Sequence, residues 1–323
     1  MWELNPIINV IHKTATMKNI KLNVFNLLKE LRKSSYEFIP NWSNLNYWFP
    51  REFISVLSKA WGFVHSLDDE IKYIFLIPLI KTTKYFSYCD EKLHKLYKSK
   101  YSKRKIEKLL KEDWENQFYY MLEKEINILL KKIYEYNLLK PKEVNYKIKS
   151  GIDTIEEKLD SEVNIPITSP PYLQAQEYIR STKLELFWLG YEESYIRNLT
   201  KKEIPYRAIN KIKIYSEKYY EFRDKINEKH LKDLYDRYFN ALLQVFSNFS
   251  EKVKDYMFIF VGQAKIRGVP IPIDDIIIEH LRTFDWIHEI TFIDKIVSRF
   301  MFQTKINQDS RIKTEHLVVL KRK

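Results

Sequence analysis

A chain of 323 residues with 55 lysines and arginines against 43 aspartates and glutamates carries a net charge of +12. This length suffices for one large domain or two small ones. The charge favours a polyanion as partner, although a generally basic proteome gives the same balance. The single cysteine excludes a disulfide scaffold and a cysteine-rich zinc site. Because the sequence shows neither a secretory signal nor an uncharged stretch as long as a membrane helix, we expect a cytoplasmic protein without a membrane partner.

The first half of the chain is predicted to be largely helical, from Leu22 to Lys147. Pro50 opens one helix, and the acidic residues 68–70 precede a second, apolar one, where the helix dipole favours negative charge. Helical periodicity continues from Asp113 to Lys140 and ends before Pro141. This region reads as a helical insert.

Basic residues are densest between Lys92 and Lys111, where they alternate with tyrosines. Such a stripe suits contact with a DNA backbone, and a solvated helix face is the alternative interpretation. The candidate DNA contacts in this stripe are Lys98, Lys100, Lys103, Arg104 and Lys105.

A short apolar run (residues 163–167) stops at the polar and aromatic residues Thr168, Ser169, Pro170, Pro171 and Tyr172. This pattern predicts a buried strand that delivers a stiff loop at its carboxyl end, where ligands collect in open α/β sheets. The two prolines lack backbone donors, so the loop carbonyls are free to accept hydrogen bonds, and Tyr172 adds a flat aromatic face. Just upstream, Asp153 is placed to cap a helix over residues 154–159.

The remainder of the chain returns to alternating elements. Residues 204–254 predict one or two long amphipathic helices, and Tyr256–Gly262 predicts a fully apolar strand. A glycine-containing turn region then leads into a helix capped by Asp274, followed by strands over 287–293 and 315–320. No histidine or carboxylate pattern suggests a metal site.

The loop and its flanks resemble a known family. Ser169-Pro170-Pro171-Tyr172 after a strand, followed by Tyr178-Ile179-Arg180 and by Leu184–Gly190, resembles the amino-methylating DNA methyltransferases of the Thr-Ser-Pro-Pro-Tyr type. Serine in the first position of the motif favours cytosine N4 over adenine N6. Cys89 does not follow a proline, as the nucleophile of the ring-carbon cytosine methyltransferases does, so that chemistry is not expected.

The resemblance implies roles for the loop. The Ser169 side chain and the Pro170 carbonyl would accept the two hydrogens of an exocyclic amino group, and Pro171 would stiffen the loop. Tyr172 would stack on a target base flipped out of double-stranded DNA. Arg180 would contact the DNA. An RNA or protein amide methyltransferase is disfavoured by Ser169 and by the basic insert.

The resemblance also implies S-adenosyl-L-methionine as cofactor. Glu3-Leu4-Asn5-Pro6 resembles the end of the family's second strand, so Glu3 would accept from the ribose hydroxyls and Asn5 would lie beside it. Asp153 would lie near the adenine ring, and Thr168 would line the cofactor site. The alternatives are an acidic residue near a helix start for Glu3 and the helix cap for Asp153.

The implied fold is an α/β, Rossmann-like methyltransferase core that is incomplete at the N-terminus. Residues 1–18 and 148–323 would form the core, and residues 19–147 would be a helical insert for target recognition. The family's central first strand and the glycine-rich turn after it are not found, and only five glycines occur. A partner polypeptide supplying that turn, a misassigned start and a decayed fragment are the three explanations.

The function implied is site-specific DNA methylation in a restriction–modification setting, with a cognate restriction endonuclease as a further partner. The alternative is a catalytically inactive, basic DNA-binding subunit or a truncated methyltransferase fragment. Binding of S-adenosyl-L-methionine by this chain alone separates the two hypotheses.

Overall fold

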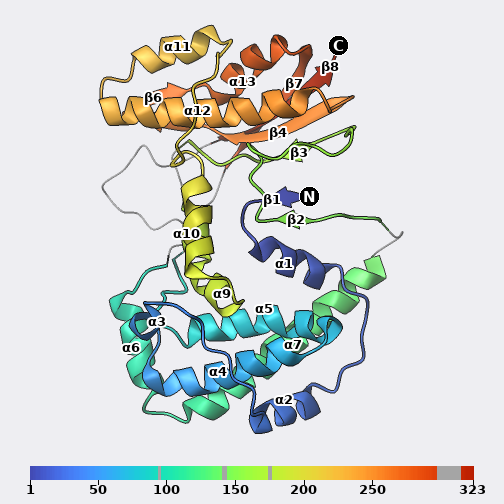
Figure 1. Cartoon of the computed structure of the whole chain (residues 1–323), viewed down its shortest axis with the longest axis vertical. Helices are drawn as coiled ribbons and strands as arrows, with labels where there is room; N and C mark the ends of the chain where they lie inside the picture. Colours follow the sequence, from blue (N-terminus) through green and yellow to red (C-terminus); the bar gives the residue numbers. More distant parts are fainter. Residues whose placement is uncertain (94–95, 140–143, 174–176, 297–313) are drawn as a thin grey trace. The chain divides into compact units, whose positions relative to one another are not determined.

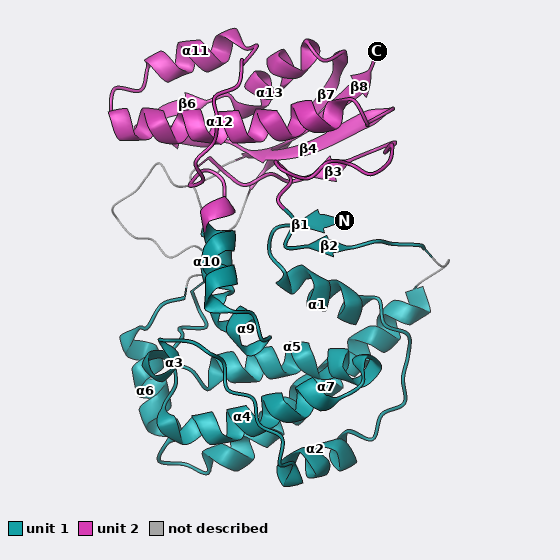
Figure 2. Cartoon of the chain, in the orientation of Figure 1, with its two compact units in different colours: residues 1–152, 177–200 teal, residues 153–176, 201–323 magenta. Residues whose placement is uncertain are grey.

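The computed structural model describes residues 1–93, 96–139, 144–173, 177–296 and 314–323 (Figure 1). The chain is mixed α/β, as predicted. It divides into two compact units: unit 1 comprises residues 1–152 and 177–200, and unit 2 comprises residues 153–176 and 201–323 (Figure 2). No helix of the described residues is both long and apolar enough to span a membrane.

The described residues of unit 1 are helical apart from one small sheet, so the predicted helical character of the first half is confirmed. β1 (Trp2–Glu3) and β2 (Lys149–Ser150) pair in parallel. The helices are α1 (Ile7–Ala15), α2 (Val24–Lys33), α3 (Leu45–Trp48), α4 (Arg51–Ser66), α5 (Asp69–Tyr85), α6 (Lys100–Leu109), α7 (Trp114–Leu139), α8 (Tyr178–Ser181) and α9 (Lys183–Trp188). The boundary with unit 2 falls within α10 (Glu193–Lys202).

An aromatic cluster organises the core of unit 1. The Trp188 ring of α9 stacks at 5.8 Å from the Trp61 ring of α4, and Phe49 meets Trp188 edge-on at 5.5 Å. The Trp61 indole donates to Thr83 of α5 over 2.9 Å, which satisfies a polar group that would otherwise be buried without a partner. The stretch 184–188 is therefore core-forming, because all five of its side chains are buried.

Unit 2 contains a four-stranded sheet in the order β3 (Ile167–Thr168), β4 (Tyr256–Gly262), β8 (Thr314–Arg322), β7 (Trp286–Lys295). β3 runs parallel to β4, and β8 is antiparallel to both of its neighbours. The predicted strands at 256–262, 287–293 and 315–320 are thus confirmed. The unit also holds α11 (Glu217–Asp224), α12 (Lys229–Ser250), α13 (Ile273–Arg282) and a hairpin of β5 (Ala264–Ile266) and β6 (Val269–Ile271).

The two faces of this sheet differ in burial. Met257, Ile259 and Val261 of β4 are buried and join a core formed with α12 and α13, which lie along one side of the sheet in Figure 1. The alternate residues Tyr256, Phe258 and Phe260 point to the opposite face and are half-buried or exposed. This alternation follows from the two-residue period of a strand.

The predicted buried strand over residues 163–167 is wrong in two respects. Only Ile167 and Thr168 form a strand, and Val163 makes an isolated parallel bridge to Val253. Ile165 and Ile167 are 47 % and 71 % exposed. The apolar run correctly located a strand, but this strand lies at the edge of the sheet. Ile167 projects from the same sheet face as Phe258, which is opposite to the face covered by α12 and α13.

The predicted helix over residues 154–159 does not form either, and the chain makes turns there. The packing boundaries of the two units also differ from the predicted core (1–18 and 148–323) and insert (19–147), since residues 1–152 belong to one unit. The predicted division into a catalytic core and a target-recognition insert concerns the function of these segments and not their packing. It therefore stays a prediction.

Candidate functional site

The loop after β3 holds the candidate catalytic residues, and all of them lie in unit 2. Ser169 is exposed, whereas Pro170, Pro171 and Tyr172 are half-buried. Leu173 follows them and is fully buried in the core of unit 2, which anchors the loop at its far end. Within the described part of the chain the Ser169 hydroxyl makes no hydrogen bond, so its lone pairs face solvent.

Tyr172 is positioned by two residues at the end of the sheet. Its hydroxyl donates to Oε1 of Glu315, the second residue of β8, over 2.6 Å. Its ring lies directly over Gly262, the last residue of β4, where an added Cβ would come within 2.4 Å of the ring carbon Cε1. Only glycine permits this approach, and Gly262 and Glu315 are cross-strand neighbours.

The sequence interpretation missed Glu315, because a carboxylate at the start of a predicted strand carries no local sign of a tertiary partner. Gly262 was seen only as the end of the strand. A glycine closing an apolar strand is the one signal that was available, since such glycines mark close approach of another group.

A second polar cluster lies at the same end of the sheet. Nδ1 of His316 donates to Oδ2 of Asp274 over 2.7 Å, and Nε2 of Gln263 donates to Oδ1 of Asp274 over 3.0 Å. Asp274 does not cap α13 as predicted, since no side chain caps that helix and its carboxylate is used by these two groups. His316 and the buried Val318 share one face of β8, so this cluster faces α13, whereas Glu315 and Tyr172 lie on the other face.

Asp153 lies in a buried ion pair. Its two carboxylate oxygens accept from Nη1 of Arg207 over 2.7 and 2.8 Å, and Oδ1 also accepts from the backbone N–H of Ile155. The pair satisfies a carboxylate that is only 7 % exposed. The geometry therefore gives Asp153 a structural partner, and its predicted contact with an adenine ring stays a prediction.

Glu3 and Asn5 belong to unit 1, where they join β1 to α1. Glu3 is exposed at the end of β1, and its Oε1 accepts from the backbone N–H of Asn5 over 3.1 Å. Asn5 Oδ1 accepts from the N–H of Ile7 at the start of α1, and Asn5 Nδ2 donates to Thr182 over 2.8 Å. The predicted strand-end and helix arrangement is confirmed, and Asn5 supports that junction.

The candidate DNA contacts divide into two groups. Lys98 donates to the Tyr47 carbonyl and lies 3.7 Å from the centre of the Tyr88 ring; burial lowers the pKa of its ammonium, with a smaller effect of Lys103. Lys105 is held by Glu91 and the Tyr85 carbonyl. Both side chains are thus committed to packing within unit 1.

The second group is exposed. Lys100, Lys103 and Arg104 occupy successive turns on one face of α6, and no ion pair to a described residue neutralises them. Arg180 of α8 is also exposed, and it pairs with Glu177 over 2.6 Å. These four cations are the surface-accessible members of the predicted set.

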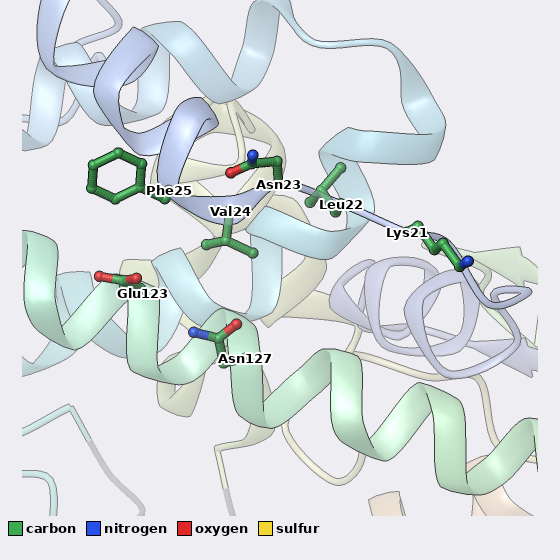
Figure 3. Close-up of a pocket in the computed structure, with 7 residues that line it drawn as sticks. All are labelled: Lys21, Leu22, Asn23, Val24, Phe25, Glu123 and Asn127. Atoms are coloured by element: carbon green, nitrogen blue, oxygen red, sulfur yellow. The ribbon is translucent and has the colours of Figure 1, made fainter.

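Unit 1 also has a shallow, open hollow, at the start of α2 and along α7 (Figure 3). Its lining comprises Lys21, Leu22, Asn23, Val24, Phe25, Glu123 and Asn127. Because Asn23 is the N-cap of α2 and the hollow holds no convergent set of reactive groups, it adds nothing to the candidate site. No group of potential metal ligands occurs among the described residues.

Comparisons with protein-family models, curated proteins and solved structures found no match to this chain.

Proposed function

We propose that this chain is the catalytic part of a DNA methyltransferase that methylates the exocyclic amino group of a flipped base, with cytosine N4 as the favoured target. The observation that carries the proposal is the loop of Ser169 to Tyr172. It leaves the carboxyl end of a parallel strand, exposes an unpaired hydroxyl and holds an aromatic ring in place through Gly262 and Glu315.

The strand arrangement supports this proposal. The resemblance implies a closing hairpin, and β7 and β8 form an antiparallel pair at the end of the chain. The described strands form the β1–β2 pair, the four-stranded sheet of unit 2 and the β5–β6 hairpin.

The loop residues would act on the amino group as hydrogen-bond acceptors. An exocyclic amino nitrogen is a poor nucleophile because its lone pair is delocalised into the base ring. If Ser169 Oγ and the Pro170 carbonyl each accept one of its hydrogens, the nitrogen becomes more nearly tetrahedral and its lone pair is freed for attack. Tyr172 would stack on the base and hold it in place.

The residues present fit the cofactor only in part. S-adenosyl-L-methionine supplies an electrophilic methyl group when it is bound. The exposed Glu3 carboxylate, at the end of a parallel strand, suits the ribose hydroxyls. All five glycines lie in described parts of the chain, and none forms a tight turn between a parallel strand and a helix. We propose that a second polypeptide supplies the glycine-rich turn.

The Ser169→Ala substitution tests the role of the loop. Loss of one acceptor hydrogen bond costs about 1–3 kcal/mol, which corresponds to a roughly 5- to 150-fold lower rate of methyl transfer. The measurement is transfer of labelled methyl groups to double-stranded DNA by the chain together with its partner. Ser161→Ala, which alters another exposed serine of unit 2, is the matched control and should keep the full rate. An unchanged rate for Ser169→Ala would contradict the proposed role.

The incomplete cofactor site also favours a second candidate function, that of a basic DNA-binding subunit without activity. Calorimetric titration of the chain with S-adenosyl-L-methionine, alone and with the second polypeptide, separates the two. Saturable binding and methyl transfer by the pair support the enzyme. DNA binding without either supports the inactive subunit.

A further inference from the structure

The outward side of α6 combines positive charge with an exposed aromatic ring. The exposed side chains at the start of this helix are three cations and one tyrosine, namely Lys100, Tyr101, Lys103 and Arg104. Residues three positions apart in a helix are neighbours on its surface, so Tyr101 lies next to Arg104. Glu107 is the one acidic residue of α6, against five basic ones. The helix therefore carries an excess of positive charge.

A second exposed tyrosine lies beside the start of α6. Nζ of Lys98 donates to the carbonyl of Tyr47 over 2.9 Å and lies 4.6 Å from the centre of the Tyr47 ring. Burial lowers the pKa of the Lys98 ammonium, and the charge of Lys103 lowers it further, so Lys103 lies within electrostatic range of this contact. Tyr47 of α3 and the cations of α6 thus belong to one surface of unit 1 (Figure 1).

Both tyrosine rings are exposed, and a lysine orients each of them. Tyr47 and Tyr101 are 55 % and 51 % exposed. The ammonium of Lys98 lies over the first ring, and that of Lys92 lies 4.3 Å from the centre of the second. Such cation–π contacts attract the charge to the face of a ring without burying the ring. The two rings therefore present oriented aromatic surface beside the cations of α6.

Exposed cations next to exposed aromatic rings match the chemistry of a nucleic acid with unpaired bases. Phosphates are attracted to the cations, and every unpaired base has flat faces that stack on a tyrosine. In a duplex these faces are covered by the neighbouring base pairs, so a duplex engages the cations and leaves the rings unused. A single strand engages both kinds of side chain.

We propose that the surface of unit 1 formed by Tyr47, Lys100, Tyr101, Lys103 and Arg104 binds single-stranded nucleic acid. The three cations contact phosphates, and the two tyrosine rings stack on unpaired bases. This binding activity is separate from the candidate loop of unit 2, and it does not depend on methyl transfer. Phosphates and base faces are common to DNA and RNA, whereas the 2′-hydroxyl that distinguishes RNA is not among the groups contacted.

Fluorescence anisotropy of the full chain with labelled oligonucleotides tests the proposal. The probes are oligothymidylate and oligouridylate of about 15 nucleotides and a DNA duplex of about the same length. The double variant Tyr47→Leu, Tyr101→Leu should bind both single strands at least about tenfold more weakly, because the loss of each stacked base costs roughly 5- to 150-fold in affinity. Its affinity for the duplex should equal that of the parent chain.

Two control variants separate stacking from other causes. Tyr47→Phe with Tyr101→Phe keeps both flat rings and should bind single strands as tightly as the parent. Tyr120→Leu with Tyr134→Leu removes two exposed tyrosines from α7, in which acidic residues outnumber basic ones, and should also bind like the parent. All four side chains are exposed, so every variant should melt at the parent temperature.

Three binding results overturn the proposal. These are the absence of saturable binding of either single strand by the parent, an equal loss of affinity for single strands and duplex in the leucine variant of Tyr47 and Tyr101, and the same loss in the control variant of α7. Binding of only one of the two single strands, lost in that leucine variant, supports the proposal and identifies the sugar.

Photo-crosslinking locates the stacked base. Irradiation of an oligonucleotide that contains 5-iodouracil joins this base to an aromatic side chain stacked on it, and sequencing of the attached peptide identifies the residue. We expect attachment at Tyr47 or Tyr101. Attachment only at Tyr172, in the candidate loop of unit 2, overturns the assignment to unit 1.

The outcomes separate this inference from the proposed function. Binding of single strands through Tyr47 and Tyr101, by a chain that transfers no methyl group alone or with its partner, leaves the inference and overturns the function. Methyl transfer to duplex DNA by a chain that shows no saturable binding of single strands leaves the function and overturns the inference.

Discussion

Gly262 and Tyr172 show how one small residue sets the geometry of the candidate loop. The tyrosine ring occupies the space that a Cβ at position 262 would fill, and its hydroxyl is held by Glu315. The loop is therefore placed by contacts with the last residue of β4 and the second residue of β8. Neither contact is local in sequence.

Gly262→Ala should displace the Tyr172 ring and reduce methyl transfer without unfolding the protein. The added methyl group would lie 2.4 Å from a ring carbon, so the ring must move from its position over the sheet. We expect the rate of methyl transfer to fall by about 10-fold or more, since small misplacements of positioned groups cost this much or more. The measurement is the rate beside a circular dichroism spectrum, with Tyr172→Phe as a variant that keeps the ring over Gly262. A rate equal to that of the parent chain would contradict the positioning role.

His280 makes the folding stability of unit 2 depend on pH. The imidazole is buried, its Nδ1 accepts from the N–H of Tyr215, and its Nε2 donates to Ser247 Oγ. Burial lowers the pKa of His280 to about 4, below the value of about 6.5 in an unfolded chain. The unfolded state therefore binds more protons between these two values, and stability falls as the pH drops through this window.

From the difference between the two pKa values, His280 should contribute roughly 3 kcal/mol of stability that is complete above pH 6.5 and lost by about pH 4. Urea unfolding of the parent chain and of His280→Gln at pH 7, 5.5 and 4.5 measures this contribution. The variant should lose less stability on acidification than the parent. His288→Gln, on β7, is the control and should follow the parent. Identical pH dependences for parent and His280→Gln would contradict the assignment.

At the scale of elements, the basic residues of α6 are of two kinds: some pack against unit 1 and others are exposed. Lys105 points back to Glu91 and the Tyr85 carbonyl, whereas Lys100, Lys103 and Arg104 form one exposed face. The basic stripe was visible in the sequence. Its division into packed and exposed cations follows from the helix period together with the packing of α6 within unit 1.

Replacing Lys100, Lys103 and Arg104 together with glutamine should weaken DNA binding by removing phosphate contacts. Each lost contact should lower the slope of log affinity against log salt concentration by about 0.9. Fluorescence anisotropy with duplex DNA at several salt concentrations measures the slope. The matched control replaces Lys124, Lys131 and Lys132, three exposed lysines of α7, with glutamine. Equal slopes for the two triple variants would show that the change in net charge, and not the face of α6, is responsible.

β3 is the element for which sequence and structure differ most. The apolar run before it predicts a buried strand, yet Ile165 and Ile167 are exposed, and only Ile167 belongs to β3 at the sheet edge. The apolar pattern indicates side chains that favour burial. Within the described part of the chain, no strand pairs with that edge.

For the whole molecule, the expected outcome is that activity requires two polypeptides. Glu3 is proposed as a ribose contact, and none of the five glycines makes a tight strand-to-helix turn. We expect the chain alone to transfer no methyl groups and the chain co-expressed with the polypeptide that carries the glycine-rich turn to do so. Methyl transfer to DNA, measured for each chain alone and for the pair, checks this. Full activity of this chain alone would contradict the expectation.

The sequence by itself determined most of the elements. Helical periodicity, the acidic residues at the start of α5 and the apolar strand at Tyr256–Gly262 were sufficient to locate them, because these signals are local. The β5–β6 hairpin was missed, since Arg267 takes a positive φ of 51°, which non-glycine residues rarely adopt. The Ser169–Tyr172 loop was located for a local reason too, as it follows a strand.

Only the tertiary structure decided which side chains meet. The contact of Tyr172 with Glu315 joins residues 143 positions apart, and the pairing of Asp153 with Arg207 spans 54. Such contacts depend on how strands and helices pack, which single-sequence patterns do not encode. The exposure of Ile167 was decided in the same way, because burial of a strand depends on its neighbours in the sheet and not on its own residues.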